Sequence, residues 1–474
     1  MSDAAVFQPV RELAERLRTR RLSPVRLAEL FLDRLERLGP RYNAVVTVTR
    51  ARALHQARRA ESEIAAGRYR GPLHGIPYGA KDLLATSGGI PTTWGAAPLR
   101  EQTFDEDATV IRRLEEAGAV LCAKLAMIEL AGGMGYRQPR ASFTGACVNP
   151  WEAGSWSGGS SSGSGVAVAA GLVPLAIGSE TWGSILSPAG ACGVTGLRPT
   201  YGRVSRHGAM ALSWSLDKLG PLALTAEDCG LVLEAVAGPD PADPTASPRP
   251  YRYEPGDGSG RRFRFGVVRA LTESCDAEVR AAFEDSLGVL RDLGSVEEVT
   301  LPDLPWEAIT RTILQAEAAS AFEDLIESGA IGGLTAPEDR YSAYARDAIL
   351  AKDYIKALRL RGVMAREADR ILSRLDALVA PGRQSVAPPL GHEFRSAMRG
   401  TAPDLMGAIG NGAGLPAVIV PNGVGGRGLP TSLQFLGRAW AENTILAAAR
   451  AYQSRTDWHR RHPPGACADR STTD

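Results

Sequence analysis

The stretch Gly158–Pro188, GGSSSGSGVAVAAGLVPLAIGSETWGSILSP, decides the fold prediction. Its first residues are mostly glycine and serine, but they run directly into the apolar Val166–Ala170, whereas a flexible linker continues into polar chain. Small residues just before an apolar helix place backbone N–H groups and hydroxyls at the helix N-terminus. A second serine-bearing loop, Gly178–Ser184, follows the apolar run Leu172–Ile177. The pattern therefore predicts that two hydroxyl groups meet at one place.

The composition excludes several classes of protein. The chain has 474 residues, 44% of them hydrophobic, which is enough for one large domain or for two to three ordinary ones. Its net charge of +1 gives no electrostatic reason to expect a nucleic acid or a membrane surface as partner. The N-terminus lacks the pattern of a signal peptide, and Val166–Ile177 is too short to span a bilayer. We expect a cytoplasmic protein.

Cysteine and histidine usage predicts neither disulfides nor a metal site. The six cysteines form no C-x-x-C pair, which is typical of reduced, mostly buried thiols in a cytoplasmic protein. The six histidines show no metal-ligand spacing, so no metal is expected.

Apolar periodicity predicts alternating helices and strands. Residues 8–67 are helical in period, with Ser23 as an N-cap before Pro24, and a short strand at Ile76–Ala80 is expected to deliver Lys81 at its end. Further helices are predicted at 108–118, 127–131, 166–170, 226–237, 277–293, 306–375 and 442–454, and further strands at 119–122, 263–268, 414–421 and 429–436. The regions 192–197 and 203–205 are expected to hold further strands and turns. Such alternation implies an α/β fold with helices on both faces of a sheet.

Two common motifs fit the glycine-serine stretch poorly. Gly159–Gly163 matches the G-x-S-x-G nucleophile elbow, which would make Ser161 a nucleophile, but an elbow follows a strand and the preceding NPWEAGSWS has turn chemistry. A phosphate-binding loop is also disfavoured because no Gly-Lys-Ser/Thr follows.

Five motifs together carry a specific resemblance. They are GPLHGIPYGAKD (71–82), GGSSSGSGVAVAAG (158–171), GSETWGSI (178–185), CGVTGLRPTYGRVS (192–205) and NGAGLPAVIVP (411–421). In this order and spacing the chain resembles the amidase signature family from about Ser23 to about Arg455, and most closely its peptide-amidase-like branch. The resemblance implies a central mixed twisted sheet covered by helices on both faces.

The resemblance also implies the site residues. The family's Ser–cisSer–Lys triad falls on Ser184, Ser160 and Lys81, with a cis peptide bond before Ser160. Its oxyanion hole falls on the backbone N–H groups of Thr181, Trp182, Gly183 and Ser184. Met134 matches a position that lines the substrate in relatives, and no cofactor is implied. Gly133, in the same glycine-rich loop, and Trp182 are further candidate substrate contacts suggested by the residues themselves.

Such a triad is chemically reasonable. A serine hydroxyl needs a base, and a desolvated, neutral Lys81 could serve, with Ser160 relaying the proton between Lys81 and Ser184 or the leaving nitrogen. Adjacent N–H groups would stabilise the tetrahedral oxyanion. The alternative role for either serine is a helix cap, a common one for serine in a glycine-rich loop.

Several positions depart from the family pattern. Glu180 stands where many members carry Asp, and Leu186 where many carry Arg, so Glu180 must find another donor. Ala126 replaces a frequent asparagine. Trp182 stands where small residues are common, and its indole either narrows the site or packs into the scaffold.

We therefore predict a stand-alone amidase that acts on a small-molecule amide or carbamate, and also on anilides or esters, as a monomer or homodimer. The alternatives are the glutaminase A-type subunit of a tRNA-dependent amidotransferase and a catalytically silent binding protein. The predicted parts are a helical segment (1–67), the signature core (68–240), helices and loops over the active site (241–405), C-terminal strands and helix completing the core (406–462) and a mobile tail (463–474).

Overall fold

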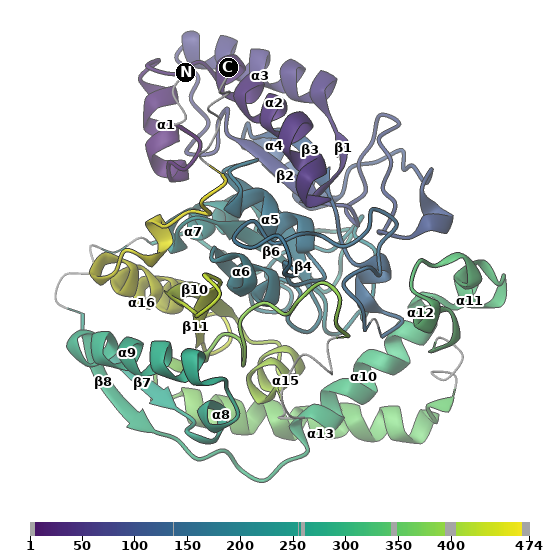
Figure 1. Ribbon diagram of the computed structural model, residues 1–474, viewed down its shortest axis with the longest axis vertical. Coiled ribbons are helices and arrows are strands. Elements are labelled where there is room, and N and C mark those ends of the chain that lie inside the picture. Colours follow the sequence, from purple (N-terminus) through teal and green to yellow (C-terminus); the bar gives the residue numbers. More distant parts are fainter. Residues whose placement is uncertain are drawn as a thin grey trace.

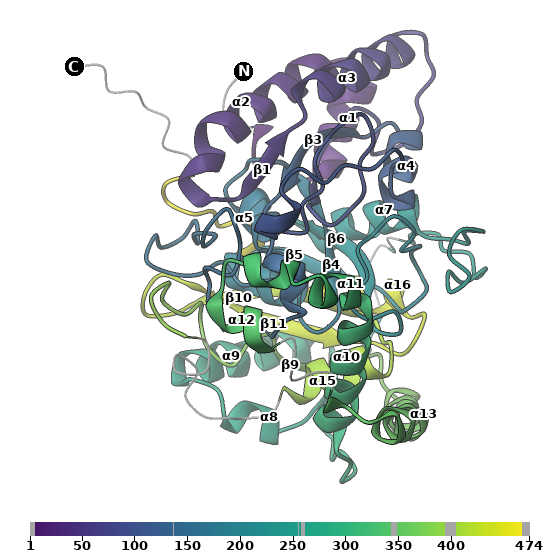
Figure 2. The same ribbon diagram turned by 90° about the vertical axis from the view of Figure 1, so that its right-hand side faces the viewer.

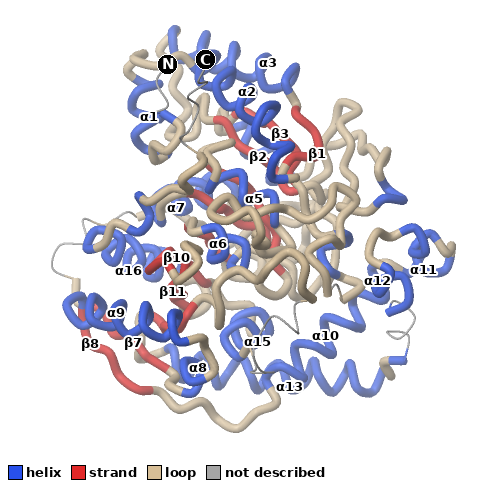
Figure 3. Tube along the Cα trace, in the orientation of Figure 1, coloured by secondary structure: helices blue, strands red, loops and turns tan. Residues whose placement is uncertain are grey.

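One mixed sheet organises the molecule. The computed structural model describes residues 5–135, 137–254, 256, 261–342, 348–393 and 404–466. Within them, eleven strands lie side by side through the middle of the molecule, with helices outside them (Figures 1 and 3). In spatial order the strands are β1 (Val45–Val48), β3 (Val120–Leu125), β2 (Pro77–Lys81), β4 (Leu175–Glu180), β6 (Lys218–Ala223), β5 (Thr195–Arg198), β10 (Ala417–Val424), β11 (Pro430–Leu436), β9 (Ala377–Pro381), β7 (Phe263–Val267) and β8 (Gly294–Glu298). Strand β2 pairs in parallel with β3 and β4, whereas β4 and β6 are antiparallel.

Helices cover both faces of the sheet, as predicted. The α-helices are α1 (Val10–Arg18), α2 (Pro24–Tyr42), α3 (Arg50–Ala65), α4 (Thr109–Glu116), α5 (Ser162–Ala169), α6 (Leu186–Cys192), α7 (Ala226–Val236), α8 (Ala270–Glu273), α9 (Ala277–Leu293), α10 (Trp306–Ala321), α11 (Glu323–Glu327), α12 (Pro337–Ser342), α13 (Ala351–Leu372), α15 (Leu405–Gly412) and α16 (Glu442–Arg455). Strand β10 shows why the sheet has two cores: Ala417 and Ile419 belong to the apolar cluster that includes α6, and Val418 and Val420 belong to the cluster that includes α9 and α16. Alternate side chains of a strand point to opposite faces, so a strand buried on both faces is apolar throughout.

Two groups of helices lie at opposite ends of the molecule. Helices α2 and α3 pack on β1 and β3 at one end of the molecule, and Ser23 caps α2 by accepting a hydrogen bond from the Arg26 N–H, which confirms the predicted cap (Figure 1). Helices α10, α13 and α15 pack together at the other end (Figure 2). The described helices include none that is long and apolar enough to cross a membrane.

The sequence prediction missed strands β1, β4, β6, β8 and β9, and the region Arg203–Ser205, expected to hold strands and turns, contains an isolated β-bridge at Val204. Strand β6 contains Gly220 and Pro221, residues that disfavour strands, yet it lies between β4 and β5. The predicted loop Gly178–Ser184 begins inside β4, which ends at Glu180.

The predicted burial of the cysteines is confirmed for the residues that the structure describes, where five free cysteines are buried, and Cys467 lies outside them. Most of the predicted tail, 467–474, also lies outside the described residues. Ala466, inside the predicted tail, is buried, and its carbonyl accepts a hydrogen bond from Arg34 at 3.0 Å.

Candidate active site

Strand β2 places a fully buried lysine at its carboxyl end. All five residues of β2 are buried, and Lys81 is the last of them. The Lys81 Nζ donates hydrogen bonds to the Oγ atoms of Ser160 at 2.7 Å and Ser179 at 2.9 Å. Both contacts are hydroxyls, which are weaker partners for an ammonium group than a carboxylate is.

The surroundings of Lys81 favour its neutral form. Burial lowers the pKa of Lys81 to about 7, although the negative charges of Asp217 and Glu180 act in the opposite direction. A buried amine loses the hydration that stabilises its charge, so its proton is released more easily. Near neutral pH, Lys81 can therefore both accept and return a proton.

Ser160 lies in the glycine-rich loop that leads into α5. The Gly159–Ser160 peptide bond is cis, the Ser160 side chain is fully buried, and its carbonyl accepts a hydrogen bond from the Ile128 N–H. The loop is packed against other backbone: a Cβ at Gly163 would lie 2.4 Å from the Ala44 carbonyl oxygen. Only glycine permits such a close approach, so the sequence GGSSSGS fixes this loop in place.

Ser184 lies in the loop between β4 and α6, beside the Ser160 loop. The Ser161 N–H donates to the Ser184 carbonyl at 3.2 Å, which joins the two loops. The helix-cap alternative is wrong for both serines, because the N-cap residues of α5 and α6 are Ser161 and Ile185. Among the described residues, no hydrogen bond joins the hydroxyls of Ser160 and Ser184.

The loop after β4 presents free backbone donors. Within the described chain, the N–H groups of Trp182, Gly183 and Ser184 have no protein acceptor. Gly183 has φ +82°, and open space surrounds the position that its Cβ would occupy. The next two N–H groups, of Ile185 and Leu186, donate to the Glu180 carboxylate at 2.9 and 3.0 Å. The free donors can therefore serve an oxygen atom brought by a ligand.

A buried ion pair fixes this loop from behind. Glu180 finds the donor that the sequence required in Arg198, whose Nη1 lies 2.7 Å from its carboxylate, and both side chains are fully buried. Burial alone would raise the pKa of Glu180, but Arg198 and Lys218 outweigh it, and the pKa lies below its ordinary value. Glu180 thus stays charged and holds the N–H groups of the first turn of α6.

Two carboxylates anchor the side chains of the same loop. The Thr181 Oγ1 donates to Asp217 at 2.5 Å, and Asp217 is buried. The Trp182 Nε1 donates to Asp404 at 2.8 Å, while the Arg311 guanidinium lies 5.3 Å from the Trp182 ring centroid. Trp182 is half-buried, so its indole is fixed at one edge and partly exposed.

Gly133 and Met134 lie beneath the helical section. A Cβ at Gly133 would lie 2.5 Å from the Phe322 ring, and Met134 is fully buried with its carbonyl accepting a hydrogen bond from Ser342. Residues 322 and 342 belong to the helical section of 306–375, so parts of this section contact the loop at Gly133 and Met134.

Sequence reasoning missed four residues that shape this site: Ser179, Arg198, Asp217 and Asp404. Asp217 carried a signal, because it stands with Lys218 at the start of an otherwise apolar stretch. Ser179 and Arg198 lie within two of the quoted motifs, but nothing in the sequence pairs them, or Asp404, with their distant partners.

Comparisons with known proteins identify the family of this chain. The Amidase family matches residues 26–446. The A-type subunit of the glutamyl-tRNA(Gln) amidotransferase of Dechloromonas aromatica is 38% identical, over 96% of this chain and 99% of the relative. The native peptide amidase of Stenotrophomonas maltophilia has a TM-score of 0.83 and 34% identity, covering 96% of this chain and 98% of that one. A chain from a vestigial protein complex that reveals the origins of an s-triazine catabolic enzyme has a TM-score of 0.87 and 30% identity, covering 94% and 98%. The chain therefore belongs to the amidase signature family.

Proposed function

We propose that this chain hydrolyses the C–N bond of linear amides through an acyl-enzyme, with Ser184 as nucleophile, Ser160 as proton relay and Lys81 as base. One observation carries the proposal: the buried Lys81 Nζ lies 2.7 Å from the Ser160 Oγ and has hydroxyls as its hydrogen-bond partners. A lysine in that setting can be neutral, and a neutral amine is the base that a serine nucleophile needs.

The reaction would run in two halves. The Ser184 Oγ attacks the carbonyl carbon while its proton passes to Ser160, whose own proton passes to Lys81. The negative oxygen of the tetrahedral intermediate takes hydrogen bonds from the backbone N–H groups of the loop 181–184. The proton then returns through Ser160 to the nitrogen, the C–N bond breaks and the amine leaves.

Water completes the cycle. It attacks the ester formed on Ser184, gives its proton to the same relay, and releases the acid as Ser184 regains its proton. The hydroxyls of Ser160 and Ser184 must align during the reaction, and such hydrogen bonds often tighten only with substrate bound. The same chemistry applies to anilides, carbamates and esters.

The surroundings of Trp182 support a restricted substrate range. The indole N–H is held by Asp404, which also caps α15 through the Gly407 N–H. A fixed indole in the oxyanion loop occupies room beside Gly183, so we infer that Trp182 limits or contacts the acyl group. Gly133 and Met134 would line the same side, under the helical section.

A substrate panel tests the proposal. Wild type and Ser184→Ala are incubated with p-nitroacetanilide, a carbamate, a peptide amide and glutamine, and product release is followed for each. We expect wild type to hydrolyse at least one non-glutamine substrate and Ser184→Ala to hydrolyse none. Equal rates for the two proteins would refute the assignment.

A second candidate function is the glutaminase component of a tRNA-dependent amidotransferase, favoured by the 38% identity to the A-type subunit of such an enzyme over nearly the whole chain. Trp182 argues against it, because a large side chain fixed by Asp404 in this loop reduces the room for a polar, extended glutamine. Glutaminase activity that arises only with co-purified partners would support this function over a stand-alone amidase.

A further inference from the structure

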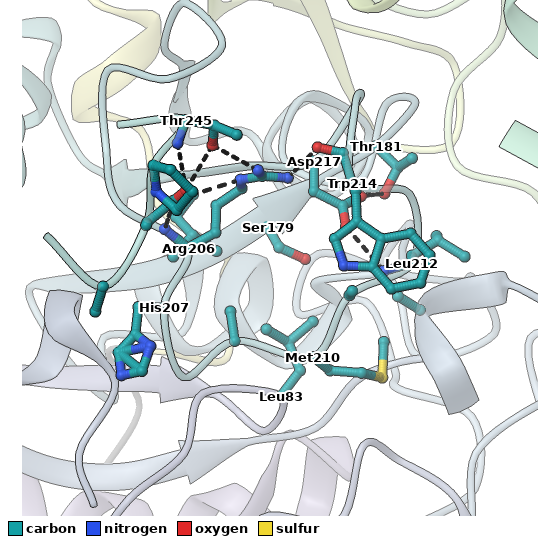
Figure 4. Close-up of a pocket in the computed structure, with 17 residues that line it drawn as sticks. Leu83, Ser179, Thr181, Arg206, His207, Met210, Leu212, Trp214, Asp217 and Thr245 are labelled. Atoms are coloured by element: carbon teal, nitrogen blue, oxygen red, sulfur yellow. Dashed lines mark hydrogen bonds and ion pairs between the residues drawn. The ribbon is translucent and has the colours of Figure 1, made fainter. Parts of the chain in front are cut away.

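A cavity of about 290 Å³ lies between the end of β4 and the loop 206–217 (Figure 4). Ser179 and Thr181 contribute its inner wall, Leu83, Met210 and Leu212 form an apolar side, and Trp214 stands at the edge. Its size is about twice that of an apolar protein cavity of ~150 Å³ that binds benzene. A substituted aromatic ring would therefore fit.

The cavity reaches the proposed active site from the lysine side. Ser179, on its wall, accepts a hydrogen bond from the Lys81 Nζ at 2.9 Å, and Thr181 begins the loop with the free N–H groups. In the proposed reaction the leaving nitrogen receives its proton from Ser160 and Lys81. The amine half of the substrate must therefore face the lysine, which is the side on which this cavity lies.

The rim of the cavity is rigid although its aromatic residue is exposed. Trp214 is 48% exposed, yet its carbonyl accepts hydrogen bonds from the Tyr201 hydroxyl and from Arg206. The neighbouring Ser213 and Ser215 both donate to the buried Glu317 of α10. An exposed indole on an immobilised backbone loses little conformational entropy when it contacts a ligand.

The charged groups around the cavity are already engaged. Asp217 accepts from the Thr181 hydroxyl and from the N–H groups of Leu212 and Ser213. Arg206 donates to the Trp214 carbonyl and to the Thr245 hydroxyl. What the cavity offers a ligand is therefore mainly apolar and aromatic surface, which suits an uncharged apolar group.

We propose that this cavity binds the amine half of the substrate and selects for aromatic amines, so that anilide-type amides are better substrates than primary amides with the same acyl group. The inference rests on the proposed function. It assigns to the loop 206–217, and to Trp214 in particular, the recognition of the leaving group.

Paired substrates test the assignment. Acetamide and p-nitroacetanilide share the acetyl group and differ only in the amine, so the ratio of their kcat/KM values reports on the leaving-group side. Ala211→Phe, which fills the cavity from a partly exposed position, should lower kcat/KM for the anilide by about tenfold or more and leave that for acetamide within about twofold. Trp214→Ala should lower the anilide value by several-fold. Ile355→Ala, an exposed apolar truncation on α13 outside the cavity, should change neither.

A binding measurement separates this inference from the proposed function. Aniline binding to Ser184→Ala, followed by saturation-transfer NMR, needs no turnover and should be lost when Ala211→Phe is added. If both substrates slow equally in Ala211→Phe, or aniline still binds to it, the cavity is not the amine subsite, whatever the enzyme hydrolyses. If wild type hydrolyses no amide although aniline binds as expected, the proposed function fails instead.

Discussion

Two buried lysines on neighbouring strands show how the same side chain can serve catalysis or structure. Lys81 is the last residue of β2. On the paired strand β3, Lys124 lies opposite Ala80, the residue before Lys81, and both lysines are fully buried. The Lys81 Nζ contacts two serine hydroxyls, whereas the Lys124 Nζ lies 3.2 Å from the Asp82 carboxylate and donates to the Leu84 carbonyl. Burial lowers the pKa of both, but only Lys124 has a carboxylate in contact to oppose it. The difference indicates that the group in contact with the Nζ, a hydroxyl or a carboxylate, decides more than burial does which lysine can act as a base.

The largest expected effect comes from removing the amine of Lys81. Lys81→Met should reduce kcat by about 10⁴-fold or more, the loss typical when the base of a serine nucleophile is removed. The fold should survive, because methionine fills a similar volume and no buried carboxylate loses a partner. Turnover numbers and thermal unfolding of wild type and variant check this. Full turnover in Lys81→Met would eliminate the lysine as base.

Removing Lys124 should have the reverse outcome. Lys124→Met leaves Asp82 buried without its cation, and such losses typically cost about 3–5 kcal/mol of stability. The kcat of the protein that remains folded should stay within a few-fold of wild type. Urea unfolding gives the free energy, and a rate per folded molecule gives the activity. If Lys124→Met lost activity as completely as Lys81→Met while staying stable, the contrast between the lysines would be wrong.

The pH dependence of the rate tests the neutral form of Lys81. Since its pKa is about 7 and the neutral amine is the base, the active fraction grows as the pH rises through 7. The rate should increase nearly tenfold per unit well below pH 7 and level off above about pH 8. A kcat/KM profile between pH 5 and 9 checks this, and an unchanging rate between pH 6 and 9 would contradict it.

Of the two lysines, only Lys81 could be singled out from the sequence. Lys81 stood out because Gly, Pro and apolar residues surround it and because the motifs around it are specific. Local features also predicted α9 and the Ser23 cap, since a cap and an apolar stripe are encoded within a few residues. Lys124 was not singled out, because its partner Asp82 is distant in sequence, in the turn that follows β2.

The features that the sequence did not reveal likewise depend on contacts between residues far apart in the chain. Arg198 of β5 contacts Glu180 of β4 only because both strands are neighbours of β6. Strand β6 itself was not predicted, because its Gly220 and Pro221 have low strand propensity. Likewise, Ser179 looked like a loop residue, but it lies within the buried strand β4, beside the lysine. The residue types in a sequence indicate which chemistry is possible, whereas the order of the strands determines which residues come into contact.

The smallest expected effect, and the finest test of the comparison, comes from Ser179. Its hydroxyl accepts a hydrogen bond from the Lys81 Nζ, and this contact both orients the amine toward Ser160 and stabilises its charged form. Ser179→Ala should therefore lower kcat by several-fold, because the amine is less well directed, and shift the midpoint of the pH profile below that of wild type. Ser179→Thr, which keeps a hydroxyl, should restore both. A fall in kcat with the midpoint unmoved would mean that Ser179 only packs against the lysine, and that Ser160 alone sets the behaviour of the base.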